Sequence, residues 1–213
     1  MSDAPDDVSG DASRGASGDA PVEIQKIWDV PTRLLKWSMA GVFATTWWYG
    51  WTLSFTTLST HRLLAYALAA ILALRVIWGF IGAPASRFSA ILRAIADAPA
   101  YTLGVLRRAP SHYPGHNPMG SLWMVGFFAL LLVQIGTGLM TYSDSFFDGG
   151  PLASTVGSSW SAWANCVHAL VARLLLAMVA LHLTAVAFYA VWKGENLVRP
   201  MLTGWKSVRR KGA

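Results

Sequence analysis

Two histidines in an apolar segment near the C-terminal end are the residues best suited to chemistry. His168 and His182 lie in the sequence NCVHALVARLLLAMVALHLTAVAFYAVW, which is otherwise almost wholly apolar. They are separated by fourteen positions (182 − 168 = 14). In an α-helix, fourteen steps return a side chain to within about 40° of the same face, about 21 Å further along the axis. One stripe of a helix is therefore expected to present an imidazole at two depths.

A third histidine, His61, is expected at the depth of His168. It begins a second apolar segment, HRLLAYALAAILALRVIWGF. A single histidine inside a membrane can simply hydrogen-bond to a neighbouring helix. Two imidazoles that face each other across a bundle can instead hold haem iron from both sides. The matched pair favours haem ligation by His61 and His168 over a structural zinc site, which needs four clustered ligands.

Two arginines accompany these histidines. Arg75 follows His61 by fourteen positions (75 − 61 = 14), so it is expected at the depth of His182. It could pair with haem propionates, or its long side chain could extend to the cytoplasmic lipid headgroups. Arg173 lies between the two histidines of the last apolar segment but on another side of the helix. Its hypothetical partner is a propionate of the haem between His61 and His168, which we call the outer haem.

The composition places these residues in a membrane protein. The chain has 213 residues, of which 54% are hydrophobic and 13% charged, whereas a soluble domain has about 25% charged residues. A membrane-spanning helix needs about 20 apolar residues, and the segments at about 35–58, 61–81, 122–142 and 167–192 qualify. The proline-containing, amphipathic segment 82–120 is interpreted as interfacial helices and loop. The expected fold class is an all-α, integral membrane four-helix bundle with interfacial helices between the second and third spans. No internal repeat is detected.

The two ends of the chain are interpreted as tails. Residues 1–26 are expected to form a disordered acidic cytoplasmic tail, because the Gly-, Ala-, Ser- and Asp-rich beginning can neither bury a core nor act as a signal peptide. Residues 27–204 form the transmembrane domain, and residues 205–213 form a basic cytoplasmic tail. The single cysteine, Cys166, excludes the C-x-x-C-H attachment motif of c-type haem.

The distribution of charge predicts the orientation. Lys and Arg are concentrated between the second and third spans and after the fourth, while the loop between the third and fourth spans contains Asp144 and Asp148 and no basic residue. Basic loops stay in the cytoplasm, so both termini are expected there and the loop 144–159 is expected in the periplasm. The net charge of +6 reflects this pattern, and no basic, aromatic soluble face indicates binding of nucleic acid.

Several motifs in order resemble the bacterial cytochrome b-561 family, which includes the cytochrome b subunit of nickel–iron hydrogenases. They are KIWDVPTRLLKWSMA, HRLLAYALAAILALRVIWGFIG, GHNPMGSLWM, the His168/His182 pair and KGENLVRPMLTG. The resemblance covers residues 27–204. It implies a four-helix bundle in the lipid of the bacterial inner membrane, with two b-type haems and quinone as a substrate. A periplasmic c-type cytochrome or dehydrogenase is the implied redox partner, and the protein is expected as a homodimer or as a subunit of a complex.

One position departs from the family pattern. The family has R-x-x-H-W in its first helix, and this chain has RLLKW, with Lys36 in place of the histidine. The second haem site, at the depth of His182, is called the inner site. It could therefore contain a haem held by Lys36 and His182, a haem held by His182 alone, or no haem. A lysine ligates iron only as the neutral amine, which burial favours. His116, in GHNP, is interpreted as a residue of the loop pattern or of a quinone site, and His112 as a solvated loop residue.

The predicted function is membrane electron transfer between quinone and a periplasmic redox partner. No side chains resemble a hydrolytic triad or a phosphate-binding loop, so group-transfer chemistry is not expected. Two alternatives remain open at this stage: a single-haem sensor or assembly factor, and a non-haem transporter of metal or small molecules. Visible spectra separate these classes, because low-spin b-type bands support electron transfer.

Overall fold

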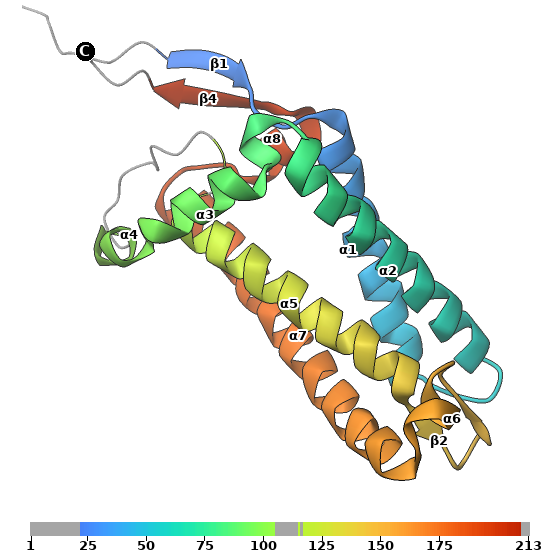
Figure 1. The fold of residues 1–213 in the computed structure, drawn as a ribbon. Helices are drawn as coiled ribbons and strands as arrows, with labels where there is room; N and C mark the ends of the chain where they lie inside the picture. The colour runs from blue at the N-terminus through green and yellow to red at the C-terminus, as the bar shows by residue number, and fades with distance from the viewer. Residues whose placement is uncertain (1–21, 105–114, 116, 210–213) are drawn as a thin grey trace, which may run out of the picture.

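Four long helices make up the body of the protein. The computed structural model describes residues 22–104, 115 and 117–209. The long helices are α1 (Val30–Trp51), α2 (Leu58–Ile81), α5 (Pro118–Met140) and α7 (Ser158–Trp192). They form two antiparallel hairpins, in which α1 packs along α2 and α5 packs along α7 (Figure 1).

Three of these helices are long and apolar enough to cross a membrane. They are α2, α5 and α7. The fourth, α1, has 22 residues, which give a length of about 33 Å and match a hydrocarbon core of about 30 Å. It contains Lys36, Ser38 and several threonines, which lower its hydropathy. The helix α1 is therefore long enough to cross a membrane, but its composition is less apolar than that of the other three long helices.

The helix boundaries differ from the sequence-based expectation. The first apolar segment was expected to continue to residue 58, but α1 ends at Trp51. The hydroxyls of Thr52 and Thr57 bond to backbone groups of this region, with Thr52 Oγ1 donating to the Trp48 oxygen (2.9 Å) and Thr57 Oγ1 accepting from Ser54 N (2.9 Å). Such bonds satisfy backbone groups outside a helix. At the other end, α7 begins at Ser158, well before the expected residue 167, and its 35 residues extend beyond the hydrocarbon thickness.

Asp29 begins α1 and joins it to α2. Its Oδ1 accepts from Thr32 N (3.3 Å) and its Oδ2 accepts from Trp78 Nε1 of α2 (2.7 Å). Burial raises the pKa of this carboxyl, but the hydrogen bonds from Thr32 and Trp78 outweigh burial and hold the pKa below its ordinary value. A capping carboxylate also stabilises the positive end of the helix dipole.

Short helices lie between the second and third long helices, as expected. They are η1 (Pro84–Ser86), α3 (Phe88–Ala96) and α4 (Ala98–Gly104). Ile91 of α3 is buried, whereas the adjacent Leu92 and Arg93 are exposed. This pattern is typical of a helix that lies on the end of a bundle. His112 and His116 lie outside the described residues.

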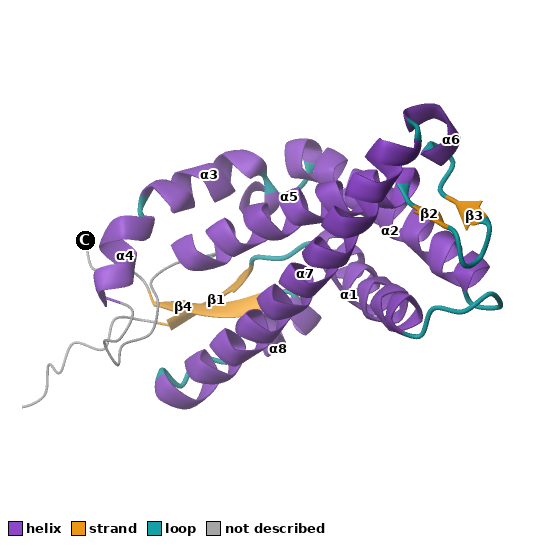
Figure 2. Cartoon of the chain, turned by 90° about the horizontal axis from the view of Figure 1, so that it is seen from below, coloured by secondary structure: helices purple, strands orange, loops and turns teal. Residues whose placement is uncertain are grey.

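Parts of both expected tails form strands instead. Strand β1 (Val22–Lys26) pairs antiparallel with β4 (Trp205–Arg209), with Val22 opposite Arg209 and Lys26 opposite Trp205. A second small pair, β2 (Tyr142–Ser143) and β3 (Asp148–Gly149), precedes the short helix α6 (Ala153–Val156) (Figure 2). The all-α expectation is thus correct for the body of the protein and incomplete at its two ends. Backbone pairing between segments near opposite ends of the chain explains the difference, because a local pattern does not reveal it.

The β1–β4 pair brings the described ends of the chain together at one end of the molecule. The helix α8 (Val198–Thr203) also lies at that end, which is opposite the 52–57 turn and α6 (Figure 1). The four long helices therefore start and finish at the same end of the molecule. We name the end with β1, β4 and α3 the inner end, and the end with α6 the outer end.

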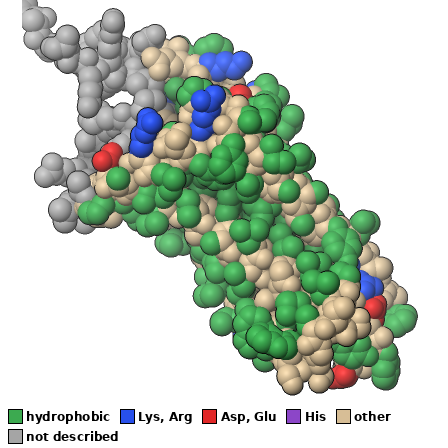
Figure 3. Space-filling model, viewed as in Figure 1, with side chains coloured by type: hydrophobic (Ala, Val, Ile, Leu, Met, Phe, Trp, Pro, Cys, Tyr) green, Lys and Arg blue, Asp and Glu red, His purple; other side chains and the backbone are tan. Residues whose placement is uncertain are grey.

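An apolar core joins the two hairpins halfway along their length. Its buried residues come from all four long helices: Met39, Leu68, Leu72, Phe127, Leu131, Val171 and Leu175. Phe43 and Phe127 meet edge to face, with ring centroids 5.6 Å apart. Outside the core, the face of the molecule seen in Figure 3 is largely hydrophobic along the helices, which suits contact with lipid.

Candidate functional site

His61 of α2 and His168 of α7 face each other across the two hairpins near the outer end. Their ring centroids are 6.4 Å apart and their planes make an angle of 82°. A metal-bound imidazole nitrogen lies about 2 Å from its metal, so two imidazoles on opposite sides of one metal have centroids on the order of 6 Å apart. The structure therefore brings together the two side chains that the sequence predicts as partners, at a separation that suits one shared metal.

The His61 ring is held by the neighbouring helix α1. Its Nδ1 donates to the backbone oxygen of Thr46 (3.0 Å), and the ring packs directly on Gly50, where an added Cβ would lie 2.9 Å from the His61 Cε1. Every larger residue at position 50 would push the imidazole away. The ring is thus fixed by one hydrogen bond and one absent side chain.

The His168 ring is held by α5 in the same way. Its Nδ1 donates to the backbone oxygen of Gln134 (3.0 Å), and a Cβ on Gly138 would lie 3.0 Å from the His168 Cε1. Gly50 follows Thr46 by four positions and Gly138 follows Gln134 by four positions (50 − 46 = 4; 138 − 134 = 4). The two hairpins therefore repeat one histidine pocket, although no repeat is detected in the sequence.

This anchoring prepares both rings to ligate a metal through Nε2. A neutral imidazole that donates from Nδ1 carries its free electron pair on Nε2, and such a bond is the usual support of a ligating histidine. The side-chain nitrogen of Gln134 lies 3.1 Å from the His168 Nε2, so it must move aside for a ligand. Within the described ranges, no group of three or more His, Cys, Asp or Glu residues could hold a metal ion. The two facing imidazoles fit haem, which supplies its remaining iron ligands itself.

His182 lies in a different environment near the inner end. Its ring stacks on Trp123, with centroids 4.3 Å apart and an angle of 28°, and Trp123 is itself fixed by a hydrogen bond from its Nε1 to the Met178 oxygen (3.1 Å). Lys36, half-buried on α1, interacts electrostatically with His182. No hydrogen bond to the His182 ring occurs within the described part of the chain. Its orientation thus depends mainly on stacking.

Arg75 is buried, with 4% of its surface exposed, so it does not extend to the headgroups. Its Nη2 donates to the Ser86 oxygen (3.3 Å), lies 3.8 Å from the Met124 Sδ, and leaves Nη1 without a partner. A buried donor without a partner is costly, and an anionic group bound there would satisfy it. Arg173 is exposed on α7, and no contact between it and either histidine is found among the described residues.

Sequence reasoning missed the residues that support the two facing histidines. Gly50 and Gly138 stand as isolated glycines in apolar helices, and such glycines often mark a close packing contact. That signal could have identified them. The accepting oxygens of Thr46 and Gln134 belong to the backbone, so no residue type could have indicated them.

The fold and this site define the class of protein: a helical membrane protein whose two hairpins bring together a pair of anchored imidazoles. A family model for prokaryotic cytochrome b561 matches residues 27–204, and the chain belongs to this family. No curated protein and no solved structure matched it. The protein is accordingly a membrane b-type haem electron-transfer protein, as the resemblance of its motifs predicted.

Proposed function

We propose that the protein transfers electrons between membrane quinone and a periplasmic redox partner through a haem held by His61 and His168. The observation that carries this proposal is the pair of facing imidazoles, each anchored through Nδ1. Bound haem supplies an iron that cycles between two oxidation states. His61 and His168 would hold the haem through their Nε2 atoms, and the apolar helices around them would exclude water.

All four long helices cross the bacterial inner membrane in this proposal, with both termini in the cytoplasm. The length of α1 supports a fourth span, and the pairing of β1 with β4 supports an even number of crossings. The basic residues before the third span and after the fourth support a cytoplasmic position for the inner end. The loop 144–159 then faces the periplasm, where a c-type cytochrome or a dehydrogenase can approach the outer haem.

A second haem at the inner end belongs to the same proposal. His182 would hold this haem, with Lys36 contributing weakly or not at all. The free Nη1 of Arg75 is a donor for a propionate. Membership of the cytochrome b561 family supports quinone as the membrane substrate.

Substitution of the paired histidines tests the ligand assignment. We expect His61→Ala and His168→Ala each to abolish the low-spin b-type signal of the outer haem in reduced-minus-oxidised spectra, because one axial nitrogen is lost. His182→Ala is the matched control in the same helix as His168 and should keep that signal. Full low-spin absorbance in both outer variants would refute the proposal.

Labelling of introduced cysteines tests the orientation. Ser154, at the outer end, and Thr203, at the inner end, are both exposed, and the native Cys166 is replaced by alanine to remove its background. A membrane-impermeant thiol reagent added to intact cells should label a cysteine at position 154 and not one at position 203. The reverse pattern would overturn the orientation together with the periplasmic docking face.

A further inference from the structure

The separation of His61 and His168 depends on how the two hairpins are joined. Each ring is anchored within its own hairpin, His61 on α1 and His168 on α5. Movement of one hairpin relative to the other would therefore carry the whole pocket with it. The apolar core joins the hairpins halfway along their length, and a further connection near the histidines would restrict both their distance and their angle.

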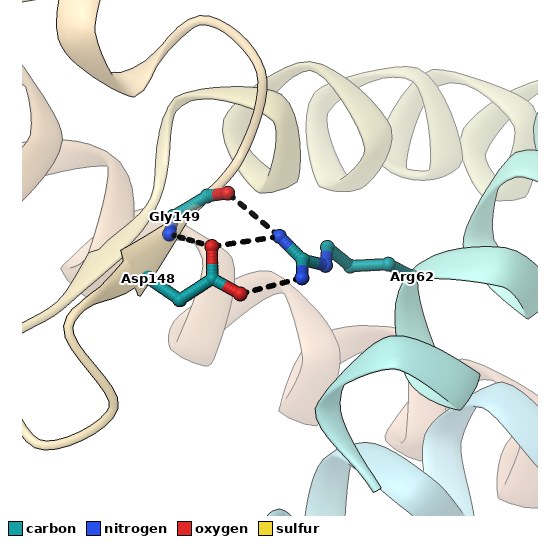
Figure 4. Close-up of polar contacts among 3 residues, drawn as sticks. All are labelled: Arg62, Asp148 and Gly149. Carbon is teal, nitrogen blue, oxygen red and sulfur yellow. Dashed lines mark hydrogen bonds and ion pairs between the residues drawn. The ribbon is translucent and has the colours of Figure 1, made fainter. Parts of the chain in front are cut away.

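Arg62, the residue after His61, makes such a connection at the outer end (Figure 4). Its Nη1 donates to the Asp148 Oδ1 (3.0 Å) and its Nη2 donates to the Asp148 Oδ2 (2.5 Å). The same Nη1 also donates to the Gly149 oxygen (2.9 Å). A fork-to-fork pair of this kind fixes direction as well as distance, because guanidinium and carboxylate are both planar.

The loop that carries Asp148 is itself fastened to the second hairpin. Gly150 N donates to the Thr141 oxygen (2.8 Å) and Leu152 N donates to the Leu139 oxygen (2.9 Å). Asn165 of α7 donates from Nδ2 to the Tyr142 oxygen (2.7 Å). These bonds reach the end of α5 that contains Gly138, the glycine under the His168 ring. The path from Arg62 to the His168 pocket is thus continuous.

We propose that Arg62 and Asp148 are positioning residues that set the distance and the angle between the His61 and His168 rings. The inference rests on the proposed function, in which these two rings hold one haem. An exposed ion pair adds little to stability, and the side chains of Arg62 and Asp148 are 32% and 41% exposed. We name the Arg62–Asp148 pair the clamp. It therefore acts on the geometry of the two histidine rings and not mainly on the stability of the fold.

Electron paramagnetic resonance of the oxidised, haem-loaded protein tests this proposal, because the low-spin ferric signal depends on the angle between the two imidazole planes. We expect Arg62→Gln and Asp148→Asn each to shift the signal of the outer haem and to speed haem transfer to apomyoglobin by about tenfold, as for other supports of metal ligands. Asp144→Asn removes an exposed carboxylate from the same loop and should behave as the wild type. An unchanged signal in both clamp variants would overturn the proposal.

Two further variants keep the outcomes distinct. Arg62→Lys keeps the charge but cannot form the fork, and we expect a shift of the signal in the same direction; it decides the question if Arg62→Gln does not accumulate in the membrane. His61→Ala should lose the low-spin signal altogether. Retention of that signal would mean that the ligand assignment has failed, whereas its loss together with an unchanged signal in the clamp variants would mean that only the clamp has failed.

Discussion

The outer and inner ends of the bundle are built from equivalent positions that carry different chemistry. At the outer end, His61 of α2 and His168 of α7 face each other, and each is held by a matching set of contacts on α1 or α5. Fourteen positions further along the same helices stand Arg75 and His182 (75 − 61 = 14; 182 − 168 = 14). The histidine pair of the outer end is thus replaced at the inner end by one arginine and one histidine.

The helices α1 and α5, which support the histidine rings, also carry different residues at their outer and inner ends. Lys36 precedes Gly50 by fourteen positions, and Met124 precedes Gly138 by the same spacing (50 − 36 = 14; 138 − 124 = 14). The groups that approach each other between the hairpins at the inner end are unlike: the charge of Lys36 would repel a protonated His182, and Arg75 Nη2 lies 3.8 Å from the Met124 Sδ. Equal pockets suit one metal held from two sides. The inner end, with the two cations Lys36 and Arg75, suits an anionic group or a haem that has His182 as its one strong ligand.

Replacement of Lys36 by histidine is expected to have the largest effect on the difference between the inner and outer sites. If the inner site contains a haem on His182, Lys36→His should convert it to a low-spin bis-histidine signal without raising haem content, because the missing nitrogen is supplied. Haem content per chain and the visible spectrum measure both quantities. A rise from one haem to two per chain would show that the wild-type inner site is empty and that our assignment is wrong. Lys36→Met, which removes the charge without adding an imidazole, is the control.

Filling the glycine positions should weaken the outer site selectively. A Cβ at Gly50 or Gly138 would lie 2.9 or 3.0 Å from the adjoining imidazole, so Gly50→Ala and Gly138→Ala should displace the ring and strain its bond to the backbone. We expect haem affinity at the outer site to fall by about tenfold, the lower range for residues that support a ligand. Gly41→Ala and Gly136→Ala are matched controls in the same helices, because nothing lies within 4 Å of a Cβ there. Equal effects in all four variants would point to helix geometry and not to the imidazoles.

Acid should release the clamp at the outer end, with the smallest effect of the three. The hydrogen bond from Arg62 is the main cause that holds the pKa of Asp148 below its ordinary value. The ion pair therefore contributes its full stability above the ordinary aspartate pKa of about 3.9 and loses it as the pH falls through the lowered value. We expect wild type to exceed Asp148→Asn in Tm by about 2 °C at most at neutral pH, and this difference should vanish in acid.

Asp144→Asn is the control for the acid experiment. It removes a carboxylate of the same loop for which no ion pair is present within the described residues, so its Tm should follow that of the wild type at every pH. A difference between wild type and Asp148→Asn that persists unchanged in acid would contradict an electrostatic clamp.

The sequence by itself determined the membrane class, the approximate long helices and the ligand candidates. Apolar segments of about 20 residues indicate spans because hydrocarbon cannot satisfy a bare backbone, and a spacing of fourteen positions places His168 and His182 on one stripe because the helix repeat is regular. The motifs led to the family, which the match over residues 27–204 confirms. These are local properties, and a local pattern is enough to predict them.

Tertiary structure decided how the candidates are supported. The bonds from His61 and His168 go to backbone oxygens of Thr46 and Gln134, which every residue type possesses, so no residue type marks them. The strands β1 and β4 and the pair Arg62–Asp148 join segments far apart in the chain. Only the packing of one hairpin on the other determines which of those distant groups meet, because helical periodicity sets the face of a residue and not its partner.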